Sequence, residues 1–219
     1  MNIFEFIRKH FMFIFFMIYR FFNIKYPIKK KFIIFGLPSS GKTSIIYFFK
    51  LGYLITSVKT YFVNEEKFTL KINHDKNHND EQNYEINFYE IGHNCSYNLI
   101  KEYADISDDV IYIIDSIHKD KLCECREDFI RILYDFRFIY RKCKFLIFMN
   151  KQDSNGCLKA EEIINYFALP NELQYRCRFI PSSTLSGQGL NEGLEWLLNY
   201  NIFYEKESII ERRKKLYDY

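Results

Sequence analysis

The chain has 219 residues, of which 48% are hydrophobic and 27% are charged, so it is long enough to bury one substantial core. Its formal net charge of only +3 argues against a nucleic-acid binder, because such proteins concentrate basic residues on one surface. We expect one folded domain over residues 31–200, preceded by a segment over 1–30 and followed by an extension over 201–219.

The most apolar stretch comes first, at residues 3–22 (IFEFIRKHFMFIFFMIYRFF). Its unbroken apolar run, from Phe11 to Tyr19, is too short to span a bilayer. We expect a helix that lies in the membrane interface, although a short signal-anchor and a helix packed on its own domain stay open as alternatives. Asn2 stands where myristoylation requires glycine, so membrane contact would come from side chains.

Two basic clusters flank the periodic part of the chain, Lys29–Lys31 before it and Arg212–Lys215 after it. Either could be a solvated flank or a contact with an acidic membrane surface. Pro27 is expected to end the first helix, and Lys29–Lys31 to lead into the first strand. No cysteine lies at the C-terminal CaaX position, so we expect no prenylation of the extension.

From residue 32 onward, short apolar runs alternate with segments of helical period, which is typical of a parallel sheet covered by helices on both faces. The predicted strands are Lys31–Phe35, Tyr61–Ile72, Tyr84–Glu90, Val110–Asp115, Lys144–Met149 and Arg178–Ile180. The predicted helices begin near Lys42, Tyr97, Lys121, Lys159 and Leu190. In the third helix a buried stripe is expected from Leu122, Phe129, Ile132, Leu133, Phe136 and Ile139.

Two features of composition indicate ordinary roles. The polar stretch at residues 73–83 (NHDKNHNDEQN) lies between strands that should pair antiparallel, so it is interpreted as an enlarged hairpin loop. The six cysteines show neither a CxxC pair nor a neighbouring HxxxH, so reduced thiols are predicted and a zinc site is not.

The first predicted strand is followed by GLPSSGKT, a full match to the GxxxxGK[ST] phosphate-binding loop. Glycines let backbone amides curl around phosphate, Lys42 would reach the terminal phosphates, and the Thr43 hydroxyl can ligate Mg²⁺. The nucleotide-binding residues predicted here are Gly36, Leu37, Pro38, Ser39, Ser40, Gly41, Lys42, Thr43 and Ser44.

A second motif chooses the base. Asn150-Lys151-Gln152-Asp153 ends an apolar strand, and the Asp153 carboxylate can accept two hydrogen bonds from guanine that adenine cannot donate. Asn150 would brace the loop, and the Lys151 stem would cover the base. Ser183 and Thr184, after the next strand, would supply polar backbone beside the guanine carbonyl oxygen.

With both motifs in place, the sequence resembles the Arf family of small GTPases over about residues 31–200. The resemblance includes Thr60 followed by Asn64, and the stretch SGQGLNEGLEWL at residues 186–197. It implies a P-loop small-GTPase fold that binds GTP or GDP with Mg²⁺. It also implies that Thr60 is a second metal ligand and γ-phosphate sensor, that Glu90 holds Mg²⁺ through water, and that the Gly92 amide is available to the γ-phosphate.

The second switch segment departs from that family. Where the family has Trp-Asp-Val-Gly-Gly-Gln, residues 89–94 read Tyr-Glu-Ile-Gly-His-Asn. Asn94 carries the amide of the family glutamine on a shorter arm, so we expect weakened positioning of the attacking water beside the catalytic Lys42. His93 removes the backbone freedom of a glycine. Pro38, and Lys59 where the family has proline, are further departures.

These residues predict an Arf-like switch that acts with an exchange factor, an activating protein and effectors. It would act on the cytosolic face of an endomembrane, of the Golgi or the endoplasmic reticulum, in membrane trafficking. The alternative is a GTP-loaded subunit that hydrolyses little and tethers a partner to a membrane, similar to the β subunit of the signal-recognition-particle receptor. A P-loop kinase or ATPase is a third option, which Asp153 disfavours.

Overall fold

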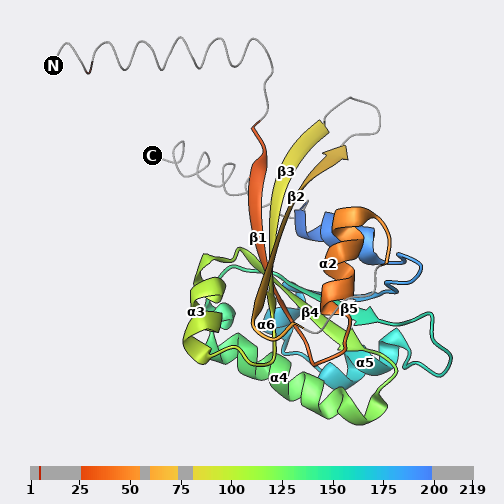
Figure 1. Ribbon diagram of the computed structural model, residues 1–219. Coiled ribbons are helices and arrows are strands. Elements are labelled where there is room, and N and C mark those ends of the chain that lie inside the picture. Colours follow the sequence, from red (N-terminus) through yellow and green to blue (C-terminus); the bar gives the residue numbers. More distant parts are fainter. Residues whose placement is uncertain (1–4, 6–25, 55–59, 74–80, 199–219) are drawn as a thin grey trace, which may run out of the picture. The chain divides into compact units, whose positions relative to one another are not determined.

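The computed structural model describes residue 5 and residues 26–54, 60–73 and 81–198 (Figure 1). Six strands form one sheet in the order β2-β3-β1-β4-β5-β6. Their bounds are β1 Ile28–Phe35, β2 Val63–Asn73, β3 Glu81–Ile91, β4 Asp109–Asp115, β5 Phe145–Asn150 and β6 Cys177–Pro181. The pairs β1–β4, β4–β5 and β5–β6 are parallel, which confirms the predicted α/β architecture with a mainly parallel sheet.

By its internal packing the chain divides into two compact units, one of residues 1–29 with 69–85 and one of residues 30–68 with 86–219. The core cluster and the candidate site described below lie within the second unit.

The helices of the structure are α2 Lys42–Leu51, α3 Tyr97–Ile106, α4 Leu122–Asp135, α5 Ala160–Phe167 and α6 Asn171–Gln174. A further helix covers residues 190–198, and single 3-10 turns lie at η1 Lys119–Lys121 and η2 Phe138–Tyr140. Local chemistry fixes several starts: the Ser96 hydroxyl accepts from the Leu99 N–H at α3, and the Glu162 carboxylate accepts from the Lys159 N–H at α5.

Apolar side chains of the sheet pack against helices on both of its faces. On one face Val110, Tyr112 and Ile114 alternate along β4 and join residues of α3, α4 and α5 in one buried cluster. On the other face the ring of Phe49 in α2 lies 6.5 Å from that of Phe148 in β5. The helix over 190–198 packs there too, since a Cβ at Gly193 would touch the Phe148 ring.

The structure corrects the predicted boundaries of the first strand and of the third helix. Lys29–Lys31 belong to β1, which begins at Ile28, so this cluster is part of a strand and is not a lead-in to one. The helix α4 ends at Asp135, before Phe136 and Ile139, because the backbone at Arg137 turns to a φ of 55°. Phe136 is still buried, so the predicted stripe marks the core beyond the helix itself.

Several predictions concern residues outside the described part of the chain. They are the interfacial helix at 3–22, residues 74–80 of the hairpin loop predicted over 73–83, Lys59 and the extension at 201–219. The other residues of that predicted loop belong to strands, Asn73 to β2 and residues 81–83 to β3. Within the described ranges, no helix is both long and apolar enough to cross a bilayer. All six cysteines are described, and each is a free thiol as predicted.

Candidate nucleotide-binding site

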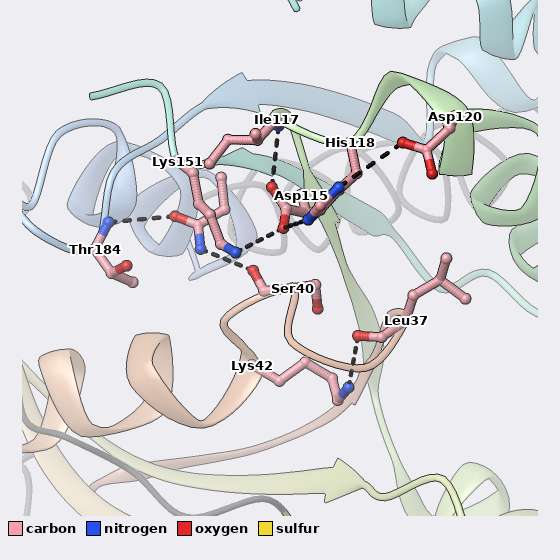
Figure 2. A network of polar contacts seen from close by, with 10 residues as sticks. Leu37, Ser40, Lys42, Asp115, Ile117, His118, Asp120, Lys151 and Thr184 are labelled. Carbon is pink, nitrogen blue, oxygen red and sulfur yellow. Dashed lines mark hydrogen bonds and ion pairs between the residues drawn. The ribbon is translucent and has the colours of Figure 1, made fainter. Parts of the chain in front are cut away.

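The loop between β1 and α2 has the backbone shape of a phosphate-binding loop. Gly41 has a φ of 100° and its missing Cβ leaves room for the Asn150 amide, so a larger residue would both be strained and collide. The Lys42 ammonium donates to the Gly36 carbonyl oxygen at 2.8 Å. It also donates to the Leu37 carbonyl oxygen at 3.2 Å (Figure 2). Lys42 therefore lies across the loop whose amides would surround phosphate.

Burial lowers the pKa of Lys42, because the charged ammonium loses contact with water. The negative charges of Glu90 and Asp128 oppose that shift. Two carboxylates thus help to keep this buried cation charged.

Three oxygen-bearing side chains meet next to the loop. The Thr43 hydroxyl donates to Glu90 Oε1 at 2.5 Å and lies 3.3 Å from the Thr60 hydroxyl. Asn64 Nδ2 donates to the second carboxylate oxygen of Glu90 at 3.1 Å. A carboxylate and two hydroxyls are hard oxygen donors of the type that Mg²⁺ prefers, so this donor set fits the metal expected from the sequence.

The second switch segment is bonded to the backbone of the first. The Gly92 N–H donates to the Phe62 carbonyl at 2.6 Å, and the Asn94 N–H donates to the Tyr61 carbonyl at 3.0 Å. A Cβ at Gly92 would lie 2.5 Å from the Phe62 oxygen, so only glycine fits this close approach. The Gly92 amide that was expected to be available is therefore engaged, and must leave Phe62 before it can bind a phosphate.

A cavity of about 540 Å³ opens over this arrangement. The predicted residues that line it are Gly36, Leu37, Pro38, Ser39, Gly41, Lys42, Thr43, Ser44, Thr60, Glu90, Gly92 and His93. Ser40 belongs to the same loop but is buried and does not line the cavity, and Asn94 is exposed outside the lining. The cavity is thus lined by the residues predicted to bind phosphate and metal. The side chain of Asn94, which was expected to position the attacking water, does not line it.

The predicted base-binding residues form a second group, held to the first by Asn150. This fully buried side chain donates to the Ser40 carbonyl at 2.9 Å and accepts from the Thr184 N–H at 3.2 Å (Figure 2). The Ser183 hydroxyl donates to the exposed Asp153 carboxylate at 2.5 Å. These hydrogen bonds join three loops that are distant in the sequence, those at Ser40, at residues 150–153 and at residues 183–184.

Comparison with known proteins agrees with this geometry. The model of the ADP-ribosylation factor family matches residues 19–201. The chain belongs to the ADP-ribosylation factor family. The structure also resembles that of the Arl6 BBS3 small GTPase from Trypanosoma brucei, which was solved with the nucleotide analogue GppNp bound. The two chains share 26% sequence identity with a TM-score of 0.61, over 78% of this chain and 96% of that one.

Membership of the Arf family confirms the resemblance read from the two motifs, and with it a GTP-binding protein of the small-GTPase fold.

The sequence prediction did not include Asp115, at the end of β4, as a site residue. Asp115 Oδ2 accepts from Lys151 Nζ at 2.6 Å, and Oδ1 accepts from the Ile117 N–H at 3.0 Å. Asp115 pairs with Asn150 in the parallel register, so an acidic residue at the carboxyl end of a buried strand was the signal available.

His118 adds to this group from the loop after β4. Its Nε2 lies 3.8 Å from Asp115 Oδ2, and its Nδ1 lies 3.8 Å from an Asp120 carboxylate oxygen (Figure 2). Lys151 itself has a φ of 69°, a left-handed backbone that disfavours most side chains. The ion pair with Asp115 holds the Lys151 stem in one direction despite that backbone.

The sequence prediction also did not include the side chains of α4 that line the cavity. Asp128, on α4, accepts from the buried Tyr112 hydroxyl at 3.0 Å and from Arg131 at 2.5 Å. Burial is the largest cause that raises the pKa of Tyr112, which stays a neutral donor. These side chains carry no sequence motif, so only the packing of α4 against β4 could bring Asp128 and Arg131 to the cavity.

Proposed function

We propose that this Arf-family protein is a molecular switch that binds GTP and GDP with Mg²⁺ and recruits effector proteins in one nucleotide state. The observation that carries the proposal is the hydrogen bond from Gly92 to the Phe62 carbonyl, at the rim of the Lys42 cavity. A γ-phosphate would compete for the same N–H. Binding GTP in place of GDP would therefore free Phe62 and rearrange the first switch segment.

Thr43, Thr60 and Glu90 are the residues that would hold Mg²⁺. When bound, the ion would neutralise phosphate charge and draw the switch segment that carries Thr60 toward the nucleotide. Lys42 would supply positive charge from the phosphate loop. Asp153 would accept from the guanine edge, while Asn150 keeps the base loop joined to the phosphate loop.

Intrinsic hydrolysis should be slow. Asn94 would have to orient the attacking water, and in the structure its side chain is exposed and its N–H is bonded to Tyr61. An activating protein could supply what the short amide arm lacks, by moving Asn94 inward or by adding a residue of its own. Exchange of GDP for GTP would in turn need an exchange factor.

Capture of effectors tests the switch. Immobilised full-length protein, loaded with GDP or with a non-hydrolysable GTP analogue, is exposed to lysate, and the retained proteins are compared. The proposal expects a set of proteins retained only with the GTP analogue. Equal retention in the two nucleotide states would remove it.

The position of Asn94 also favours a second candidate, a GTP-loaded subunit that hydrolyses little and tethers a partner to a membrane. Single-turnover hydrolysis separates the two. A switch should turn over faster when an activating protein is added, whereas a tether should keep its GTP with or without Asn94→Gln. A wild-type rate typical of Arf proteins would exclude the tether.

The same switch would act at a membrane through residues 3–22, on the cytosolic face of the Golgi or endoplasmic reticulum. The apolar run from Phe11 to Tyr19 supports this part of the proposal. Cosedimentation of the full chain with acidic liposomes is expected, and Phe13→Glu with Phe16→Glu should abolish it. Unchanged binding by the double variant would place the membrane contact elsewhere.

A further inference from the structure

Glu90 is one methylene longer than the aspartate of the family motif quoted above, and that difference raises a problem of orientation. The side chain is 1% exposed at the end of β3, so its carboxylate depends on protein partners. A glutamate has one more torsion than an aspartate, and more ways to turn its carboxylate away from the metal-binding threonines. Something must hold it toward Thr43.

The neighbouring strand β2 supplies such a partner. Asn64 Nδ2 donates to Glu90 Oε2 at 3.1 Å, while Oε1 accepts from Thr43 at 2.5 Å. Each carboxylate oxygen thus has its own donor, one from the sheet and one from the phosphate-binding helix. The amide of Asn64 is neutral, so it orients the carboxylate without cancelling the charge that a cation would bind.

We propose that Asn64 is a positioning residue, whose amide keeps the long Glu90 side chain aimed at Thr43 and Thr60 and so strengthens the hold of Mg²⁺ on the bound nucleotide. The inference rests on the proposed function, because it assumes that Mg²⁺ accompanies the nucleotide. Asn64 itself contacts neither ion nor nucleotide in this account. Its effect passes through Glu90.

The test is the release rate of a fluorescent GDP from the full-length protein, measured in millimolar Mg²⁺ and again in excess EDTA. Asn64→Leu keeps the approximate size of the side chain but removes the donor. Release in Mg²⁺ should become about tenfold faster, the effect expected when a charged acceptor loses one hydrogen bond. In EDTA the variant and the wild type should differ by less than about twofold, because no ion then depends on Glu90.

Two further variants keep the result specific. Asn64→Ala should reproduce the Mg²⁺-dependent loss if the leucine variant folds poorly, and Asn64→Leu should have no further effect in a Glu90→Ala background. Glu66→Gln is the matched control, because Glu66 lies on the same strand but pairs with Lys50, at 2.6 Å. Its release rates should match those of the wild type in both conditions.

The outcomes separate the inference from the function on which it rests. Wild-type release that is slowed by Mg²⁺, with both Asn64 variants equally slowed, would overturn the positioning role alone. Wild-type release at one rate with and without Mg²⁺ would overturn the metal assignment and this inference with it. Faster release of the variants in EDTA as well as in Mg²⁺ would show a general structural defect and also reject the positioning role.

Discussion

The base-binding end and the switch end of this site are built differently. At the base end a fully buried Asn150 joins two loops, Lys151 is paired with Asp115, and the motif matches the family pattern. At the switch end, Gly92 and Asn94 donate to carbonyls that belong to another segment, and the motif departs from that pattern. We therefore expect selectivity for the base to rest on a fixed frame, and the response to phosphate to rest on bonds that can be exchanged.

The largest effect expected at the base end is that of Asp153→Ala. Without the carboxylate, two charge-assisted hydrogen bonds to guanine disappear, so GDP affinity should fall by about 100-fold or more. Titration calorimetry measures it. Asp120→Ala is the control, since Asp120 is an exposed carboxylate near the same loops that lies beside His118. Equal affinities for all three proteins would refute the role of Asp153.

Removal of the Asn150 side chain, which joins the phosphate loop to the loop at Thr184, should lower the stability of the protein as well as its affinity for nucleotide. Asn150→Ala leaves the Ser40 carbonyl and the Thr184 N–H without their partner, so the free energy of unfolding should fall by about 2–3 kcal/mol. Urea unfolding followed by circular dichroism measures the change. Asn155→Ala, at an exposed position of the same loop, should stay within about 0.5 kcal/mol of the wild type. If Asn150→Ala were as stable as Asn155→Ala, the base-binding end would not be a fixed frame.

At the switch end, the expected change is a gain. Asn94→Gln restores the reach of the amide and should raise the single-turnover rate of GTP hydrolysis by about tenfold, if positioning of water limits the reaction. GDP affinity should not change, because the Asn94 side chain is exposed outside the cavity. No gain in rate, at unchanged affinity, would mean that the backbone of this segment and not the length of its side chain limits hydrolysis.

The smallest effect is expected from Asp115→Asn. Lys151 would lose its ionic partner but keep a hydrogen-bond acceptor, and the pair is partly exposed, so GDP release should accelerate only about threefold. Stopped-flow fluorescence measures this rate at low and at high salt. The difference should shrink at high salt, where such a pair is screened. An acceleration of about 100-fold, as large as the loss of GDP affinity expected for Asp153→Ala, would mean that Lys151 contributes more than cover for the base.

The sequence predicted the sheet, the phosphate loop and the base loop because each is encoded within a few consecutive residues. GLPSSGKT and NKQD carry their own geometry, and the apolar runs of β4 and β5 leave little choice of structure. The partners of those motifs could not be predicted in the same way. Asp115 meets Lys151, and Asn64 meets Glu90, only through the pairing of strands.

The availability of Gly92 could not be predicted for a related reason. Its sequence context shows a glycine beside a phosphate, but whether its N–H is free depends on where the first switch segment lies. The length of β1 was underestimated because three lysines in a row resemble a solvated lead-in. A strand that is exposed at one end tolerates them.

Direct titration tests whether one pocket of this protein binds guanine nucleotides with Mg²⁺. Nucleotide-free full-length protein is titrated with GDP, a GTP analogue and ADP, each with and without Mg²⁺. Both guanine nucleotides should bind tightly, and more tightly with Mg²⁺, whereas ADP should bind more weakly by about 100-fold or more. Equal binding of GDP and ADP, or no retention of either guanine nucleotide, would contradict this prediction.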